Sequence, residues 1–164
     1  MADYKREVKV GIVVVLDNVR SMHNIGSVFR TCDALKVEKL VLCGITATPP
    51  HREIQKTALD ATKSVTWKYY EQTEDAIGEL KRLGYEIVGV EQTDSSVNLM
   101  DYKPEKSRKY ALVFGNEVDG VDEGVLGLCD RLVEIPQWGT KHSLNIAVSA
   151  GIVLWDMVWK LEKG

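Results

Sequence analysis

The feature that most constrains the fold of this chain is an alternation of continuous apolar runs with helical patterns. The first run, Val10–Leu16, is rich in β-branched residues and has no polar position, which is typical of a strand buried on both faces. Comparable runs predict further strands at Lys39–Cys43, Glu86–Val90, Tyr110–Phe114 and Arg131–Ile135, with a weaker one at Val65–Tyr70. Helical spacing between the runs predicts helices at Ile25–Leu35, Glu74–Leu83, Glu123–Cys129, and from Leu144 to about Lys163. This alternation predicts an α/β domain with a mostly parallel sheet and helices on both faces.

Polar or small residues gather at three places where a predicted strand ends or a predicted helix begins. These are Asn24–Thr31, Phe114–Glu117, and Ile135–Gly139 with the nearby Ser143–Asn145. In open α/β folds, ligands bind in the crevice beyond the carboxyl ends of the strands. Three separate segments of this kind therefore predict a binding site, where one segment alone would predict only a turn.

Composition limits the classes of function that fit. The 164 residues carry a formal net charge of −3, which argues against a protein that coats nucleic acid through charge alone. A local basic patch stays possible at Arg52, Lys56, Lys63 and Lys68, although these residues also fit a solvated face. No apolar signal core or membrane-length run is present, and the three cysteines form no C-x-x-C pair. We therefore expect a cytoplasmic protein that contacts no membrane and keeps its thiols reduced.

The first polar segment offers Asn24 and Arg30 as candidate functional residues. Asn24 stands where the helix should begin, so capping is its simplest role. Arg30 lies roughly opposite the buried stripe of that helix, and Gly26 is one turn before it on the same side. A glycine at that place leaves room for a ligand to approach the guanidinium, although a solvated arginine is the simpler alternative.

The other two segments add an acid, a hydroxyl and an amide. Glu117 follows the strand Tyr110–Phe114, and Gly115 permits close approach of a ligand. Ser143 could cap the final helix, whereas Asn145 is an amide inside an apolar helix and needs polar partners. No phosphate-gripping loop, nicotinamide-type G-x-G-x-x-G, metal-ligand spacing or G-x-S-x-G elbow is present. The residues alone therefore define a polar crevice and leave its reaction open.

The final predicted helix is apolar almost all round, so it must be buried on most of its sides. A small domain offers limited surface to cover such a helix. We expect a homodimer that buries part of Leu144–Lys163, with burial inside the monomer as the alternative.

The three polar segments, in this order, closely resemble the motifs of the SpoU-type (TrmH-like) RNA ribose methyltransferases of the SPOUT superfamily. The matching pieces are Asn24–Thr31, Phe114–Gly120, and Ile135-Pro136-x-x-Gly139 with the stretch that starts at Ser143-Leu144-Asn145. Any one piece is a weak signal, but three in register are specific. Gln137-Trp138 departs from the family, which often has Met and a small residue at this place in the pocket wall.

The resemblance implies one SPOUT methyltransferase domain over residues 1–164, with a deep trefoil knot in its C-terminal part. It implies S-adenosylmethionine as methyl donor, a ribose 2′-hydroxyl of tRNA or rRNA as acceptor, and a homodimer; the lack of metal-ligand spacing predicts no metal. The cofactor would be held largely by backbone groups, at positions that map onto Gly89, Val90, Glu91, Gln92, Thr93, Gly115, Ile135 and Leu144.

By the same mapping Arg30 is the key catalytic residue, and Asn24, Glu117, Ser143 and Asn145 orient it and the ribose. Arginine stays protonated in proteins, so Arg30 is better suited to bind phosphate and stabilise a developing alkoxide than to act as a base. A non-catalytic RNA-binding or assembly module on the same fold is the alternative. The five polar residues together favour the enzyme, because a binding module needs no such set.

Overall fold

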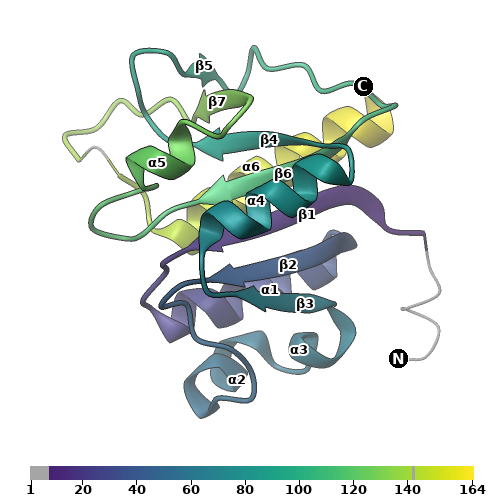
Figure 1. The fold of residues 1–164 in the computed structure, drawn as a ribbon, viewed down its shortest axis with the longest axis vertical. Coiled ribbons are helices and arrows are strands. Elements are labelled where there is room, and N and C mark those ends of the chain that lie inside the picture. Colours follow the sequence, from purple (N-terminus) through teal and green to yellow (C-terminus); the bar gives the residue numbers. More distant parts are fainter. Residues whose placement is uncertain (1–7, 142) are drawn as a thin grey trace.

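A seven-stranded parallel sheet organises the chain in the computed structural model, which describes residues 8–141 and 143–164. The strands are β1 (Val10–Asp17), β2 (Val37–Cys43), β3 (Trp67–Tyr70), β4 (Tyr85–Val90), β5 (Val97–Asn98), β6 (Lys109–Phe114) and β7 (Arg131–Glu134). They lie in the order β3-β2-β1-β6-β4-β7-β5, and each neighbouring pair is parallel. Because all strands run the same way, their carboxyl ends meet along one edge of the sheet (Figure 1).

Helices cover both faces of the sheet, as the sequence predicted. Four lie with one face: α1 (Met22–Ala34), α2 (Arg52–Ala58), α3 (Ala61–Ser64) and α6 (Ile146–Lys163). On the other face lie α4 (Thr73–Arg82) and α5 (Glu123–Leu126). Along β1, Ile12, Val14 and Leu16 pack in the first core and Val13 and Val15 in the second. Burial on both faces explains why β1 has no polar position before Asp17, its last residue.

Some elements differ from their predicted bounds. Helix α2 was not predicted, because Ile54 and Ala58 are its only buried side chains and seven residues carry little periodicity. The first helix begins at Met22 and not at Ile25, and α5 ends at Leu126. The stop at Gly84 is confirmed, since this residue follows α4 with a φ of +90°.

One face of α6 has no covering element. Ala150, Val153, Leu154 and Met157 are buried against the sheet and α1. The opposite face is an exposed apolar stripe, which we call the α6 stripe, made of Val148, Ile152, Trp155 and Trp159, each 40–56% exposed. The two indole rings stack with their centroids 5.8 Å apart. The expectation that this helix is buried on most sides is therefore not met by one copy of the described chain.

The described cysteines are free thiols, and Cys32 and Cys43 are buried as expected. Burial raises the pKa of Cys43 to about 12 and that of the half-buried Cys129 to about 11. All remain protonated at neutral pH, so they are inert packing groups. Among the described helices, none combines the length and apolar character needed to cross a membrane.

Candidate functional site

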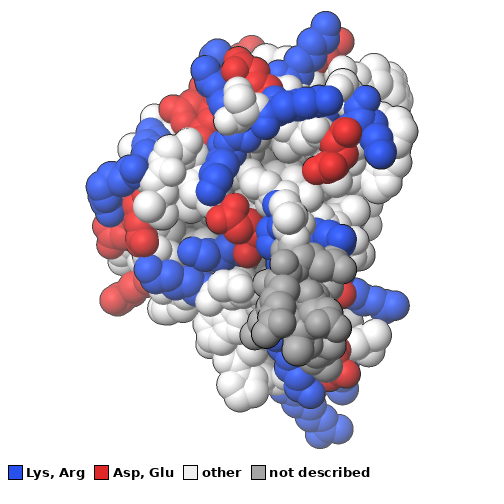
Figure 2. Space-filling view, turned by 90° about the vertical axis from the view of Figure 1, so that its right-hand side faces the viewer, with Lys and Arg blue, Asp and Glu red and all other residues white. Residues whose placement is uncertain are grey.

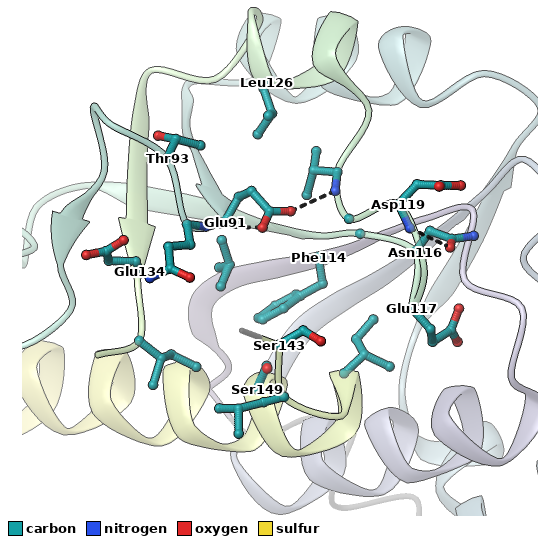
Figure 3. Close-up of a pocket in the computed structure, with 18 of the residues that line it drawn as sticks. Glu91, Thr93, Phe114, Asn116, Glu117, Asp119, Leu126, Glu134, Ser143 and Ser149 are labelled. Atoms are coloured by element: carbon teal, nitrogen blue, oxygen red, sulfur yellow. Dashed lines mark hydrogen bonds between the residues drawn. The ribbon is translucent and has the colours of Figure 1, made fainter. Parts of the chain in front are cut away.

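A cavity of about 410 Å³ lies at the carboxyl ends of β4, β6 and β7, where the sequence predicted a crevice. Figure 3 shows side chains from several distant segments converging on it. Its walls are the loop after β4, the loop after β6, the segment after β7, and the start of α6. Its size is within the range of pockets that take one small organic ligand.

Close backbone packing forms the wall that follows β6. A Cβ added to Gly115 would lie 2.1 Å from the backbone nitrogen of Val121, so no other residue fits there without moving this loop. Asn116 and Gly120 exchange two backbone hydrogen bonds of 2.9 Å, which closes the loop between them. The side-chain oxygen of Asn116 accepts hydrogen bonds from the N–H groups of Val118 and Asp119 (Figure 3). Gly120 has a φ of +70°, a backbone conformation that favours glycine.

Two carboxylates from other strands hold this wall in place. Glu91 accepts a 3.0 Å hydrogen bond from the N–H of Val121 and a 3.1 Å bond from the N–H of Gln92. Asp17, which is buried at the end of β1, accepts hydrogen bonds from the N–H of Asp122 at 3.1 Å and from the hydroxyl of Thr73. The cavity is therefore braced before any ligand enters it.

Glu117 connects the cavity to the start of α1. Its carboxylate accepts hydrogen bonds from the N–H groups of Ser21 at 2.9 Å and Arg20 at 3.1 Å. Partial burial raises the pKa of Glu117, but the hydrogen bonds from Ser21, from its own N–H, from Arg20 and from the Asn24 side chain outweigh this effect. The pKa of Glu117 therefore lies below its ordinary value, and the side chain is a carboxylate at neutral pH. Its hydrogen bonds join the loop after β6 to the loop between β1 and α1.

The predicted catalytic residues separate into two groups. Glu117 and Ser143 line the cavity, and Asn24 reaches Glu117 through its side chain. Arg30 is exposed and borders a different hollow, of about 330 Å³, beside α2 and α3. Asn145 is also absent from the described lining of the cavity. One copy of the chain therefore does not bring all five residues together.

Seven of the eight predicted cofactor positions line the cavity; they are Val90, Glu91, Gln92, Thr93, Gly115, Ile135 and Leu144. Gly89 does not. A Cβ at Gly89 would lie 2.8 Å from Leu132 and 3.0 Å from Cys129, so this glycine allows β4 to pack against the segment of β7 and α5. Its place in the sequence is explained by packing alone.

Three expectations about local geometry are wrong. Ser21, and not Asn24, caps α1, since its hydroxyl accepts a hydrogen bond from the Asn24 N–H. Asn145 is not inside the final helix, because α6 begins at Ile146 and Asn145 is its exposed N-cap, bonded to the N–H of Ala147 at 2.8 Å.

The third concerns Gly26, which leaves no room beside Arg30. It is buried, and a Cβ there would lie 2.4 Å from the backbone oxygen of Ile54. Its small size lets α1 and α2 pack in direct contact.

The described lining of the cavity contains carboxylates but no lysine or arginine. Its acidic residues are Glu91, Glu117, Asp119, Glu123 and Glu134. The sequence analysis missed Asp119, Glu123 and Glu134 as lining residues, whereas Gln137, which it placed at the pocket wall, does line the cavity. Glu134 directly precedes the predicted Ile135, so a wider window around that position would have found it. A pocket of this charge attracts a cationic ligand and repels a phosphate.

The basic stretch around residues 52–68 is largely neutralised. Lys56 pairs with Glu53 at 3.0 Å, Lys63 with Asp60 at 3.1 Å, and Lys68 with Glu79 at 3.3 Å. The solvated-face interpretation therefore describes these lysines better than a binding patch. Within residues 8–141 and 143–164, no three His, Cys, Asp or Glu side chains are grouped as a metal site would require.

The fold and the cavity together define an α/β protein with a cavity of small-ligand size at the carboxyl edge of a parallel sheet. The chain belongs to the SpoU rRNA Methylase family, which it matches over residues 11–155. This match covers all three polar segments, and the family predicted from them is confirmed.

Two relatives show how far the similarity extends. The chain is 31% identical over 153 residues to a tRNA (guanosine(18)-2′-O)-methyltransferase of Aquifex aeolicus, covering 88% of this chain and 67% of that protein. It is 32% identical over 143 residues to the 23S rRNA (guanosine-2′-O-)-methyltransferase RlmB of Neisseria meningitidis serogroup B. That match covers 87% of this chain and 56% of RlmB. The chain thus spans between about half and two thirds of these two relatives.

Solved structures agree with the fold. The crystal structure of the A. aeolicus TrmH/SpoU tRNA modifying enzyme superposes with a TM-score of 0.85 at 27% identity, covering 99% of this chain and 84% of that one. An AdoMet-bound rRNA methyltransferase from Sinorhizobium meliloti superposes with a TM-score of 0.85 at 26% identity, covering 98% of this chain and 61% of that one.

Proposed function

We propose that this chain is a single-domain, S-adenosylmethionine-dependent methyltransferase that modifies a ribose 2′-hydroxyl of tRNA or rRNA. The observation that carries the proposal is the braced cavity at the carboxyl edge, which has a carboxylate lining and no cation among its described residues. The names of the two relatives, which are a tRNA and a 23S rRNA 2′-O-methyltransferase, support the reaction.

The cavity fits this cofactor. When bound, S-adenosylmethionine supplies a methyl group on a positively charged sulfonium, and the lining carboxylates favour a positive charge. Gly115 and Gly120 let the loop after β6 close on itself and on Glu91, and both line the cavity, where their backbone groups can contact a ligand. Gln92 and Thr93 add polar side chains at the end of β4. An AdoMet-bound relative at 26% identity supports the same assignment.

Glu117, Asn24 and Ser143 are proposed to orient the acceptor ribose at the mouth of the cavity. Glu117 is ionised and already fixed by the β1–α1 loop, so it can accept a hydrogen bond from a ribose hydroxyl without reorganisation. Arg30 is proposed to bind the neighbouring phosphate and to stabilise negative charge on the attacking oxygen. Asn145 holds the start of α6, which carries Leu144 and Ser143 to the cavity.

Arg30 opens on another hollow, so its proposed role requires a second copy of the chain. The α6 stripe supports a homodimer, because an exposed apolar face of this size is unfavourable in water. In such a dimer the Arg30 of one copy would serve the cavity of the other.

The deep trefoil knot and a cytoplasmic location are also part of the proposal. The strand order β6-β4-β7-β5, which places β4 between two later strands, supports the knot.

Mixing two inactive variants tests the shared site. Arg30→Ala lacks the arginine, and Gly115→Val displaces the loop that forms one wall of the cavity. In a mixed dimer, one cavity is intact and faces an intact Arg30 of the other copy, so about a quarter to a half of the expected activity should return. If mixing restores nothing, although mixed dimers form, Arg30 acts within its own chain or not at all.

The central experiment measures methyl transfer from labelled S-adenosylmethionine to total tRNA and to rRNA from cells that lack the protein. We expect ribose-methylated nucleotides in the digested product, identified by mass spectrometry. A substrate with a 2′-deoxy residue at the modified position should bind and accept no methyl group. Tight RNA binding without any methyl transfer would favour the alternative of a non-catalytic binding module.

A further inference from the structure

A second hollow lies at the opposite, amino edge of the sheet. It measures about 560 Å³ and lies between the start of β4, the start of β7 and the end of α4. Three exposed cations line it, Lys81, Arg108 and Arg131, and three more, Lys103, Lys106 and Lys109, are exposed within six residues of Arg108 in the chain. We call these six residues the basic edge surface. Figure 2 faces this edge and shows Lys and Arg side chains spread over it, with fewer Asp and Glu side chains between them.

Two carboxylates orient the arginines of this surface. Glu86 lies 3.3 Å from Arg108 and 3.8 Å from Arg131, and Glu105 lies 3.2 Å from the Nε of Arg108. Both guanidinium groups remain more than half exposed, at 53% and 64% of their side chains. They are therefore held in place and still open to a ligand.

The lysines of the surface are not neutralised in this way. Lys81, Lys103 and Lys106 form no ion pair with a described residue, and Lys109 lies 5.4 Å from the ring of Tyr85. The six cations outnumber the four carboxylates that line the hollow or contact its lining residues, which are Glu38, Glu86, Glu105 and Asp130. This excess occurs in a chain whose formal net charge is −3.

Helix electrostatics explain only part of this arrangement. Lys81 lies in the last turn of α4, where a cation stabilises the helix. Lys103, Lys106 and Arg108 belong to no helix, since they lie in the segment between β5 and β6. Four of the seven residues from 103 to 109 are cations. Arg108 pairs with Glu86 and Glu105, and Lys109 lies over the Tyr85 ring, but Lys103 and Lys106 have no such contact with a described residue.

We propose that the basic edge surface binds the phosphate backbone of the RNA, and this inference rests on the proposed function. The carboxylate-lined cavity has no described cation to hold phosphates, so the anchoring charge must come from elsewhere. The six residues of β6 separate the two edges by about 20 Å. A folded RNA of several tens of nucleotides is longer than this, so it contacts both edges in one complex. Phosphate contacts supply affinity and fix the orientation of the RNA.

Matched lysine variants test the surface. The test variant is Lys103→Gln/Lys106→Gln/Lys109→Gln; the control is Lys56→Gln/Lys63→Gln/Lys68→Gln, which removes the same charge from lysines that are ion-paired. Binding of fluorescein-labelled total tRNA and of an rRNA fragment is measured by anisotropy over a series of KCl concentrations. The test variant should bind RNA at least about tenfold more weakly, and its log–log salt slope should become shallower by about 2 to 3 units. The control should stay within about twofold of the original protein.

The remaining outcomes separate this inference from the proposed function. Calorimetry of S-adenosylmethionine binding should give the same result for both variants, which also verifies that they fold. Weaker RNA binding by the test variant with no methyl transfer by the original protein supports the surface and contradicts the enzyme. Equal RNA binding by both variants, no RNA binding by the original protein, or a difference seen only with vesicles of anionic phospholipid overturns the inference.

Discussion

The carboxyl edge of the sheet is built from close backbone packing, whereas the amino edge presents long, exposed side chains. At the carboxyl edge, Gly115 and Gly120 let one loop close directly on another, and Glu91 and Asp17 hold that loop through its N–H groups. At the amino edge, Lys103 and Lys106 extend into solvent from a segment without helix or strand. A rigid wall suits a small ligand with a fixed shape, and mobile point charges suit a large polyanion.

Gly115→Val should have the largest effect, because the added side chain overlaps the backbone at Gly120 and Val121. We expect a loss of about 3 kcal/mol in the free energy of unfolding, measured by urea denaturation, and no detectable cofactor binding by calorimetry. Gly78→Ala is the control: its Cβ would lie 3.5 Å from Arg82, an ordinary contact inside α4. This change should stabilise the protein by about 0.5 to 1 kcal/mol. Normal cofactor binding by the Gly115 variant would contradict the proposed cavity.

Salt should separate the two edges without any mutation. If the amino edge contacts about three phosphates, raising KCl from 50 to 200 mM should weaken RNA binding about 40-fold. Binding of S-adenosylmethionine should change by less than about twofold, because the cofactor carries no phosphate. Anisotropy and calorimetry in the same buffers measure both. If the RNA affinity changed as little with salt as the cofactor affinity, the two edges would not differ in the way proposed.

Two aspartates provide a matched pair, one at each edge. Asp17 is buried and accepts hydrogen bonds from Thr73 and from the N–H of Asp122, so Asp17→Asn turns an amide hydrogen towards a donor. This should lower the free energy of unfolding by about 2 kcal/mol. Asp130 is exposed and accepts one hydrogen bond, from the N–H of Ile87 at 2.8 Å, so Asp130→Asn should lower it by less than about 1 kcal/mol. Equal losses in urea denaturation would show that the carboxyl edge is not the more strongly braced one.

The smallest effect concerns the pH dependence of the link between Glu117 and α1. The pKa of Glu117 is lowered in the fold, so its hydrogen bonds are fully present above its ordinary pKa of 4.5. They are lost as the pH falls through the lower pKa of the folded protein. The amide proton resonance of Ser21, followed by NMR, should therefore shift with a midpoint below 4.5. Glu117→Gln should abolish this shift, and a midpoint above 4.5 would contradict the assigned hydrogen bonds.

The sequence predicted those parts of the molecule that depend on local pattern. The run Val10–Leu16 identified β1 because burial on both faces leaves no polar position. Glu117 was placed at the crevice because it lies just beyond the end of a strand, and Ile135 was assigned to the cofactor by the family resemblance; both line the cavity. The charge of α2 concealed its two buried positions, Ile54 and Ala58, so that helix was missed.

Tertiary contacts decided what the sequence could not. A sequence does not distinguish a glycine that leaves space for a ligand from one that allows two helices to pack closely. The backbone oxygen of Ile54, 2.4 Å from a Cβ at Gly26, shows that Gly26 is of the second kind. A shift of one residue in the start of α6 turned Asn145 from a core amide into a cap. The bond from Val121 to Glu91 joins residues 30 positions apart, which no periodicity can reveal. The separation of Arg30 from the cavity has the same origin.

The stacked Trp155 and Trp159 on the α6 stripe allow intrinsic tryptophan fluorescence to report whether this stripe is exposed to water. The sequence has four tryptophans, and the third exposed one, Trp138, shares the apolar hollow of about 710 Å³ that Trp155 lines. Three of the four fluorophores therefore sit on one surface. When that surface leaves water, their emission should move to shorter wavelength together, while Trp67 on β3 contributes a constant background. The intrinsic tryptophan emission, recorded while unlabelled protein is diluted, would then report assembly without any added dye.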